Sequence, residues 1–302
     1  MTEFPALIAG SGSLAQYLAA NKAAVTGVLA QAGAVLFRGF DVPDALAFDA
    51  AIEAYGEPSF TYEDSLSNAV RTNITSRVFT ANEAPPETEI FLHHEMAQTP
   101  IYPSALFFYC EIAPDEGGAT PLCRSDWVLE RLAAEAPRFI DRLVNEGVRY
   151  TNVMPGDDDA GSGQGRSWKS TLNSAARGEA EARLRQLGYS WEWQSDGSLR
   201  AKTPALPAIR DLGDGRRSFF NQLIAAYRGW SDSRNDPNKA ITFGEGAGIT
   251  AEDMAPAIAI GDGLTYDLQW QAGDVALVDN FSVMHGRRPF KGKRRVLASL
   301  IS

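Results

Sequence analysis

The chain has 302 residues, of which 44% are hydrophobic and 22% are charged, and its formal charge at pH 7 is -10. This length and hydrophobic content are sufficient for a folded core, and we expect one domain over residues 1–302. The excess of acidic residues disfavours nucleic acid and anionic membranes as partners. The sequence contains no apolar run of membrane-spanning length, and its first residues do not have the pattern of an export signal, which predicts a cytoplasmic protein.

The first half of the chain alternates between helical and strand-like patterns. Apolar residues at helical spacing predict helices over 11–33 and 45–56, with a strand AVLFRGF between them. The apolar run ALFFYCEI at 105–112 is typical of a buried strand, and helical periodicity returns over 127–147. Cys110 and Cys123 are interpreted as buried thiols, because a cysteine pair in a reducing compartment is seldom a disulfide.

The second half begins with the polar stretch 155–166, which predicts a loop that is either a lid or a plain surface excursion. A helix near 178–187 and a hairpin with an Asp-Gly turn follow, and short strand-like segments occupy 264–301. Strands at both ends of the core, with helices inserted between them, predict a mainly β protein of the α+β class. The expected architecture is an antiparallel barrel or jelly roll of the cupin kind, with a mouth for a ligand.

Two of the three histidines of the chain stand side by side in FLHHEMA. Residues i and i+2 of a strand project from the same face, so His93 and Glu95 are predicted to point into the barrel while His94 points away. His94 is the alternative ligand at this position. His285 follows an apolar strand much later in the chain and can supply a third ligand. Two histidines and one carboxylate on one side of an ion are typical of non-heme Fe(II) oxygenases.

A basic run, KGKRR, follows His285 and precedes the strand-like VLASLI, which indicates that at least one arginine is directed inward. A guanidinium donates two parallel hydrogen bonds to a carboxylate, as the distal carboxylate of 2-oxoglutarate requires. We expect Arg295 to have this role, assisted by the hydroxyl of Thr120 in EGGATPL. Arg294 adjoins it, and a register shift of one residue would exchange the two arginines. The alternative interpretation is a solvated basic run.

The chain resembles the taurine dioxygenase superfamily, in particular the clavaminate synthase-like enzymes and the syringomycin-type aspartyl hydroxylases of peptide-antibiotic pathways. The resemblance covers most of the chain and runs, in the order of the family, through EIFLHHEMAQ, GGATPLCRSDWVL, SWKSTLNS, SFFNQ, ITFGEGAGI and QAGDVALVDNFSVMHGRRPFKGKRRVL. It implies a double-stranded β-helix. It also implies Fe(II) bound by His93, Glu95 and His285, and 2-oxoglutarate bound by Thr120 and Arg295.

The activity implied by this resemblance is that of an Fe(II)- and 2-oxoglutarate-dependent dioxygenase that consumes O2. We expect it to hydroxylate a C–H bond of an amino acid, free or bound to a carrier protein, in secondary metabolism. Desaturation and cyclisation are alternatives, and chlorination is disfavoured because Glu95 takes the coordination position that chloride occupies in related halogenases. Arg71 and Asn221 are candidate substrate contacts. A cupin-like metal protein that does not use 2-oxoglutarate, or a binding module without turnover, would not need Arg295.

Overall fold

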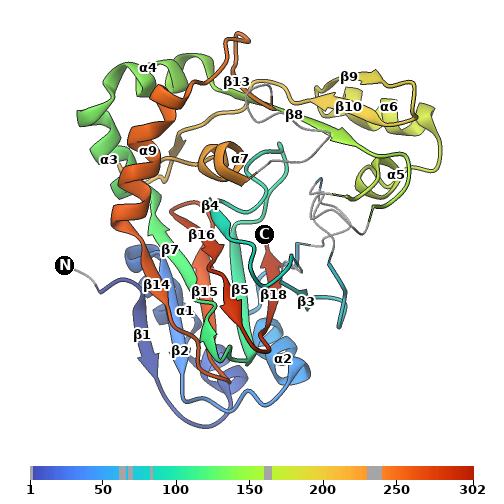
Figure 1. Cartoon of the computed structure of the whole chain (residues 1–302). Coiled ribbons are helices and arrows are strands. Elements are labelled where there is room, and N and C mark those ends of the chain that lie inside the picture. The colour runs from blue at the N-terminus through green and yellow to red at the C-terminus, as the bar shows by residue number, and fades with distance from the viewer. Residues whose placement is uncertain (1–2, 61–65, 67–70, 82–83, 160–164, 230–239) are drawn as a thin grey trace.

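A computed structural model of the chain describes residues 3–60, 66, 71–81, 84–159, 165–229 and 240–302, and its centre consists of two facing β-sheets (Figure 1). In order across the larger sheet, the strands are β1 (Ala6–Ala9), β2 (Ala34–Arg38), β15 (Val275–Asp279), β5 (Ala105–Ile112), β18 (Arg295–Ile301) and β3 (Phe79–Thr80). The smaller sheet has the order β14 (Tyr266–Leu268), β7 (Thr120–Arg124), β16 (Val283–Arg287) and β4 (Ile90–His93). Neighbouring strands are antiparallel except for the parallel pair β1–β2, and the predicted jelly roll is confirmed.

The larger sheet is covered on both faces. In β5, Phe108 and Cys110 point between the two sheets, whereas Phe107 and Tyr109 point toward helices α1 (Leu14–Ala32) and α2 (Ala45–Tyr55). A strand without a solvent-facing side is apolar throughout, which explains the continuous run ALFFYCEI. Cys110 and Cys123 are buried free thiols, as predicted. Burial raises the pKa of each thiol to about 12.

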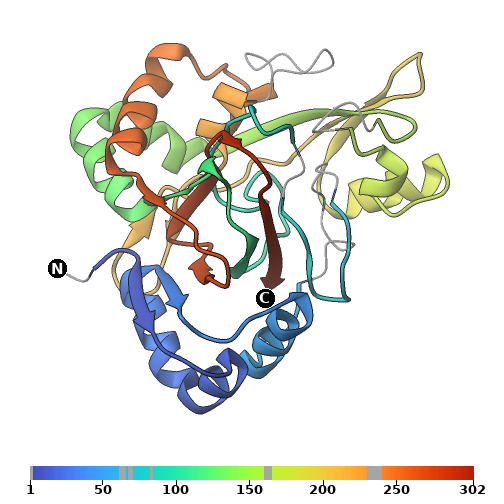
Figure 2. The same ribbon diagram turned by 60° about the horizontal axis from the view of Figure 1, so that its bottom comes forward.

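Helices α1 and α2 lie side by side on the outer face of the larger sheet (Figure 2). Ser13 caps the start of α1 by accepting the amide of Gln16, and Asp44 caps α2 in the same way. Gly33 ends α1 with φ 81°, in the left-handed region that costs glycine least. Both predicted helices are confirmed. Among the described residues, no helix has the length and apolar character needed to cross a membrane.

A helical layer packs over the smaller sheet. It contains α3 (Ser125–Glu135), α4 (Pro137–Glu146), α7 (Leu223–Gly229) and α9 (Ala251–Leu264). The helical pattern predicted over 127–147 is confirmed and is divided between two helices, because α3 ends before Pro137 and α4 begins with it. Proline lacks the amide hydrogen that a helix interior uses, but it fits the first helical position, where that hydrogen has no partner.

A second four-stranded sheet crosses the top of the barrel in Figure 1. Its strands, in order, are β13 (Ile241–Phe243), β8 (Val148–Met154), β10 (Leu199–Lys202) and β9 (Ser190–Trp193), and α5 (Trp168–Thr171) and α6 (Arg177–Gln186) lie beside it. The predicted helix near 178–187 and the hairpin after it are confirmed. Of the loop predicted at 155–166, residues 160–164 lie outside the described residues. Two short ribbons pair β6 (Glu116–Gly117) with β17 (Phe290–Lys291), and β11 (Arg210–Asp211) with β12 (Arg217–Ser218).

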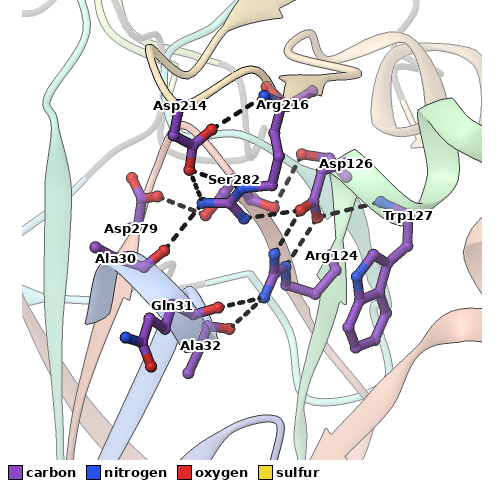
Figure 3. A network of polar contacts seen from close by, with 12 residues as sticks. Ala30, Gln31, Ala32, Arg124, Asp126, Trp127, Asp214, Arg216, Asp279 and Ser282 are labelled. Atoms are coloured by element: carbon purple, nitrogen blue, oxygen red, sulfur yellow. Dashed lines mark hydrogen bonds and ion pairs between the residues drawn. The ribbon is translucent and has the colours of Figure 1, made fainter. Parts of the chain in front are cut away.

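A buried ionic network connects α1 to the end of β7 (Figure 3). Asp126 accepts hydrogen bonds from both Arg124 and Arg216. Arg124 also donates to the carbonyls of Gln31 and Ala32, at 2.9 and 3.0 Å, and so satisfies the C-terminal end of α1. Because Arg124 is paired with Val283 of β16, the network supports the strand that carries His285.

Candidate metal centre and cosubstrate site

Three potential metal ligands converge at the smaller sheet. His93 ends β4, and His285 of β16 is its direct neighbour across the sheet. The Nε2 atoms of His93 and His285 lie 3.7 and 3.5 Å from Oε2 of Glu95, and the three ligand atoms lie within 4.8 Å of one another. Ligands at right angles around an ion with bonds of about 2.1 Å are about 3 Å apart, so a small contraction would let all three bind one divalent ion.

The approach of these strands depends on Gly286. A Cβ atom at this position would lie 2.3 Å from the carbonyl oxygen of Ile90, so any larger residue would push β16 away from β4. A glycine in this place is also typical of a plain turn. The structure shows that it allows the close pairing of the two strands that carry the histidines.

Glu95 reaches the site from a turn, not from a strand. The strand ends at His93, and Met96 turns the chain with φ 59°, an unusual value for a residue other than glycine. The prediction that His93 and Glu95 share a strand face is therefore wrong in its local geometry, although the two side chains do converge. His94 points away, as predicted: it is fully buried, packs against Phe220, and its Nδ1 contacts a backbone carbonyl.

Asn280 holds the turn that presents Glu95. Its Oδ1 accepts the amide hydrogen of Glu95 at 2.7 Å, and its Nδ2 donates to the carbonyls of Glu95 at 3.0 Å and Pro103 at 2.8 Å. The side chain is fully buried between β15 and β16. Sequence reasoning missed this residue. The only signal was a polar side chain directly after the apolar strand VALVD.

Contacts and burial favour the metal-binding forms of the ligand groups. Nδ1 of His93 lies 2.8 Å from the carbonyl of Phe91, which can only accept, so this contact places a hydrogen on Nδ1 and directs Nε2 toward the site. Burial, with His93 nearby, lowers the pKa of His285 to about 4 and keeps it neutral. Burial disfavours the charge on Glu95, but Arg71 and the two histidines hold its pKa well below the usual range. Two imidazoles and a carboxylate suit Fe(II).

The two candidate substrate contacts have different surroundings. Nη2 of Arg71 donates to Oε1 of Glu95 at 3.0 Å, so the structure brings this arginine to the metal site. Asn221 lies apart, with its Nδ2 donating to the carbonyl of Ala208 and its Oδ1 accepting the amide of Leu223. Both ends of the buried Asn221 amide thus bond to the backbone. The predicted role of Asn221 as a substrate contact is therefore wrong, and its side chain has a structural role.

The two adjacent arginines point in opposite directions. In β18, Val296 and Ala298 face the barrel interior whereas Leu297 faces the helices. The pairing with β5 shifts register between Arg295 and Val296, and the contacts of the two arginines show that Arg294 is the one directed inward. Arg295 instead pairs with Glu111 at 2.8 Å, with 46% of its side chain exposed. The expectation that Arg295 is directed inward is wrong, and the alternative register is the one that forms. Arg294 donates to the carbonyl of Gly118 at 2.9 Å and approaches the hydroxyl of Thr120.

Thr120 lies on the same face of the smaller sheet as His285. Its strand pairs with β16 so that Leu122 is opposite His285, and Thr120 is two residues before Leu122. Its Oγ1 is 2.9 Å from the indole Nε1 of Trp270 and 3.4 Å from Nη2 of Arg294. No motif in the sequence marks Trp270 as part of this site. Burial lowers the pKa of Arg294 to about 10, so the guanidinium is still charged at neutral pH.

The jelly roll, with two histidines and a carboxylate converging at one sheet, defines the class of the protein as a non-heme iron oxygenase. Residues 5–300 match the family described as taurine catabolism dioxygenase TauD, TfdA family, and the chain belongs to this family. The resemblance found in the sequence is thereby confirmed. The protein is an Fe(II)- and 2-oxoglutarate-dependent dioxygenase.

Relatives extend over nearly the whole chain. A clavaminate synthase-like protein of Arabidopsis thaliana is 44% identical over 286 residues, 94% of this chain and 86% of the relative. The dapdiamide synthesis protein DdaC of Enterobacter agglomerans is 27% identical over 288 residues, 91% of this chain and 83% of the relative. A solved asparagine oxygenase, in complex with Fe(II), 2S,3S-3-hydroxyasparagine and succinate, shares the fold with a TM-score of 0.55 at 15% identity, covering 95% of this chain and 78% of that one.

Proposed function

We propose that this dioxygenase hydroxylates an unactivated C–H bond of an amino acid or amino-acid derivative, free or attached to a carrier protein, in secondary metabolism. We also propose that residues 1–302 act as one oxygenase domain. The observation that carries the proposal is the convergence of His93, Glu95 and His285 on the barrel face that also presents Thr120. The bound hydroxyasparagine of the solved oxygenase supports an amino-acid substrate, and the relative named as a dapdiamide synthesis protein supports a biosynthetic role.

In this proposal the three converging side chains hold Fe(II). The bound iron supplies a centre at which the keto-acid end of 2-oxoglutarate chelates and O2 is reduced. Glu95 occupies the third protein position of that centre, so a chloride ion has no vacant carboxylate position to fill. Hydroxylation or desaturation is therefore expected, and chlorination is not.

Arg294 and Thr120 hold the distal carboxylate of 2-oxoglutarate in our proposal. A hydroxyl has two acceptor positions and one hydrogen. Trp270 and Arg294 both donate toward Oγ1 of Thr120, which leaves its hydrogen to be donated to an anion. Arg294 adds a buried positive charge at the same place. A guanidinium and a hydroxyl donor side by side match a carboxylate with two oxygens.

Apolar side chains surround this site in the barrel interior. Phe108 lies against His285 with 5.2 Å between ring centroids, and apolar side chains from both sheets lie beyond it. Apolar surroundings strengthen the ion pair between Arg294 and a bound carboxylate, and they limit side reactions at a reactive centre.

The proposed function is tested by anaerobic addition of Fe(II) and 2-oxoglutarate, followed by oxygen and a panel of amino acids. A chelated keto acid gives a weak visible charge-transfer band, and turnover gives succinate together with a product heavier by one oxygen atom. A product lighter by two hydrogens would assign desaturation or cyclisation instead. Absence of amino-acid-dependent succinate over the whole panel, including carrier-bound amino acids, would reject the substrate class.

A further inference from the structure

We infer that Arg71 is a positioning residue that holds one oxygen of Glu95 and restricts this carboxylate to a single metal-binding oxygen. The inference rests on the proposed function, because it concerns the same metal site. It assigns to Arg71 a role toward the metal ligand, which differs from the substrate contact expected from the sequence.

The two oxygens of Glu95 face different partners. Oε2 lies between the two histidines, at 3.5 Å from His285 and 3.7 Å from His93. Oε1 accepts a hydrogen bond from Nη2 of Arg71 at 3.0 Å. The side chains of Arg71 and Glu95 are 9% and 5% exposed, so water competes little for this contact. A charge-assisted hydrogen bond in such a place is strong and directional.

Arg71 is anchored independently of the metal site. The amide of Thr72 donates to Oγ1 of Thr80 at 3.0 Å, and the amide of Thr80 donates to the carbonyl of Thr72 at 2.9 Å. The guanidinium lies over the ring of Phe79, 5.3 Å from its centroid, and β3 pairs with β18 of the larger sheet. Arg71 therefore extends from the larger sheet to a ligand that follows a strand of the smaller sheet, and contacts outside the metal site hold its segment in place.

The contact between Arg71 and Oε1 of Glu95 affects how many coordination positions of the metal remain open. An octahedral ion bound by two imidazoles and one carboxylate oxygen has three positions left. The chelating keto acid of 2-oxoglutarate takes two of these positions, and O2 needs the third. A carboxylate bound through both oxygens would occupy that last position. By engaging Oε1, Arg71 makes the second bond unfavourable and keeps the position open.

The experiment compares the wild type with Arg71→Gln and with Arg77→Gln as a matched control. Arg77 lies in the same segment but pairs with Asp49 and Glu53. Each protein is loaded anaerobically with Fe(II) and 2-oxoglutarate, and nitric oxide serves as an unreactive substitute for O2. The charge-transfer band measures chelation, and the electron paramagnetic resonance signal of the nitrosyl adduct measures access to the last position.

We expect Arg71→Gln to keep the charge-transfer band but to bind nitric oxide about tenfold more weakly, the scale on which partners of metal ligands act. Arg77→Gln should match the wild type. Unchanged nitric oxide affinity in Arg71→Gln would overturn the inference, as would loss of the band itself, which would assign Arg71 to chelation. Wild-type protein without a band would reject the proposed function instead.

Removal of a buried cation can unfold a protein, so Arg71→Lys is measured in parallel. Lysine keeps the positive charge but replaces the planar guanidinium with a single ammonium group on a different stem. We expect it to weaken nitric oxide binding to a smaller extent than glutamine does. Wild-type affinity in a folded Arg71→Lys protein would also contradict the inference. A raised KM for the amino acid, with unchanged nitric oxide binding, would assign Arg71 to the substrate.

Discussion

The guanidinium of Arg294 lies beside the hydroxyl of Thr120, with 3.4 Å between Nη2 and Oγ1. The neighbouring Arg295, the first residue of β18, points the other way and pairs with Glu111. Consecutive residues of an extended chain point to opposite sides, so only one of these two arginines serves a site inside the barrel. Substitution of Arg295 therefore serves as the control for substitution of Arg294.

Arg294→Gln should raise the dissociation constant of 2-oxoglutarate about 10- to 100-fold, because a hydrogen bond to a charged group contributes about 1.5–3 kcal/mol. Arg295→Gln should leave it within about twofold, since an exposed ion pair contributes about 0–1 kcal/mol to stability and nothing to this site. Both constants are read from anaerobic titration of the charge-transfer band. The reverse ranking of the two variants would reject the assignment of Arg294.

Trp270→Phe should weaken 2-oxoglutarate binding a few-fold while keeping an aromatic ring at this buried position. The substitution removes the Nε1 hydrogen bond to Thr120, which as a neutral hydrogen bond contributes about 0.5–1.5 kcal/mol, together with part of the buried ring volume. In combination with Thr120→Val the two effects should not add, because both act through the same hydroxyl. Additive losses in this double-mutant cycle would show that Trp270 acts elsewhere.

Asn280→Asp should lower both the stability of the protein and its affinity for a divalent ion. The aspartate keeps an acceptor for the amide of Glu95 but loses the donor to the carbonyls of Glu95 and Pro103. Buried acceptors left without a donor cost about 1–3 kcal/mol each. Thermal unfolding in the absence of metal measures the stability of the protein, and titration with Co(II) measures its affinity for a divalent ion. Wild-type values in both measurements would rule out a role for Asn280 in holding the turn.

Stability at low pH should depend on Asp126. Burial disfavours its charge, but Arg124 and Arg216 outweigh burial and lower its pKa in the folded state. An acid with a lowered folded pKa contributes stability above its unfolded pKa, near 3.9, and loses that contribution as pH falls through the folded pKa. Urea unfolding of the wild type from pH 6 to 3 should therefore show a loss of stability.

Asp126→Asn should be less stable at pH 6, by about 3 kcal/mol, because it leaves the buried Arg124 without its anion, whereas Arg216 keeps its ion pair with Asp214. Its stability should also fall less steeply than that of the wild type between pH 4 and 3. Parallel curves for the two proteins over this range would show that Asp126 does not carry the acid sensitivity.

Much of the site was accessible from the sequence because histidines are scarce in this chain. With three histidines in all, a His-x-Glu motif and one late histidine left few ways to build a metal site. The buried strand β5 was also predictable, because its sequence is apolar on both faces. The local route to Glu95 was not, because the turn at Met96 depends on Asn280, which is 184 positions away from Met96 (280 − 96 = 184).

The choice between Arg294 and Arg295 shows a limit of pattern reasoning. Alternation identifies the inner face of a strand only when the other face is polar. In β18, Leu297 packs against the outer helices and Val296 against the inner core, so both faces of the strand are apolar. The hydrophobic pattern therefore does not show which face points into the barrel. Trp270 could not be predicted either, because its contact with Thr120 joins two segments that are far apart in the sequence.

The central claim is that His93, Glu95 and His285 hold one iron ion. It is tested most directly by measuring bound Fe(II) per chain, together with the charge-transfer band, in Ala variants of these three residues and in His94→Gln as the control histidine. We expect one iron per chain and a band in the wild type and in His94→Gln, and loss of both in each Ala variant. Full iron binding by His93→Ala or His285→Ala, or its loss in a folded His94→Gln protein, would contradict it.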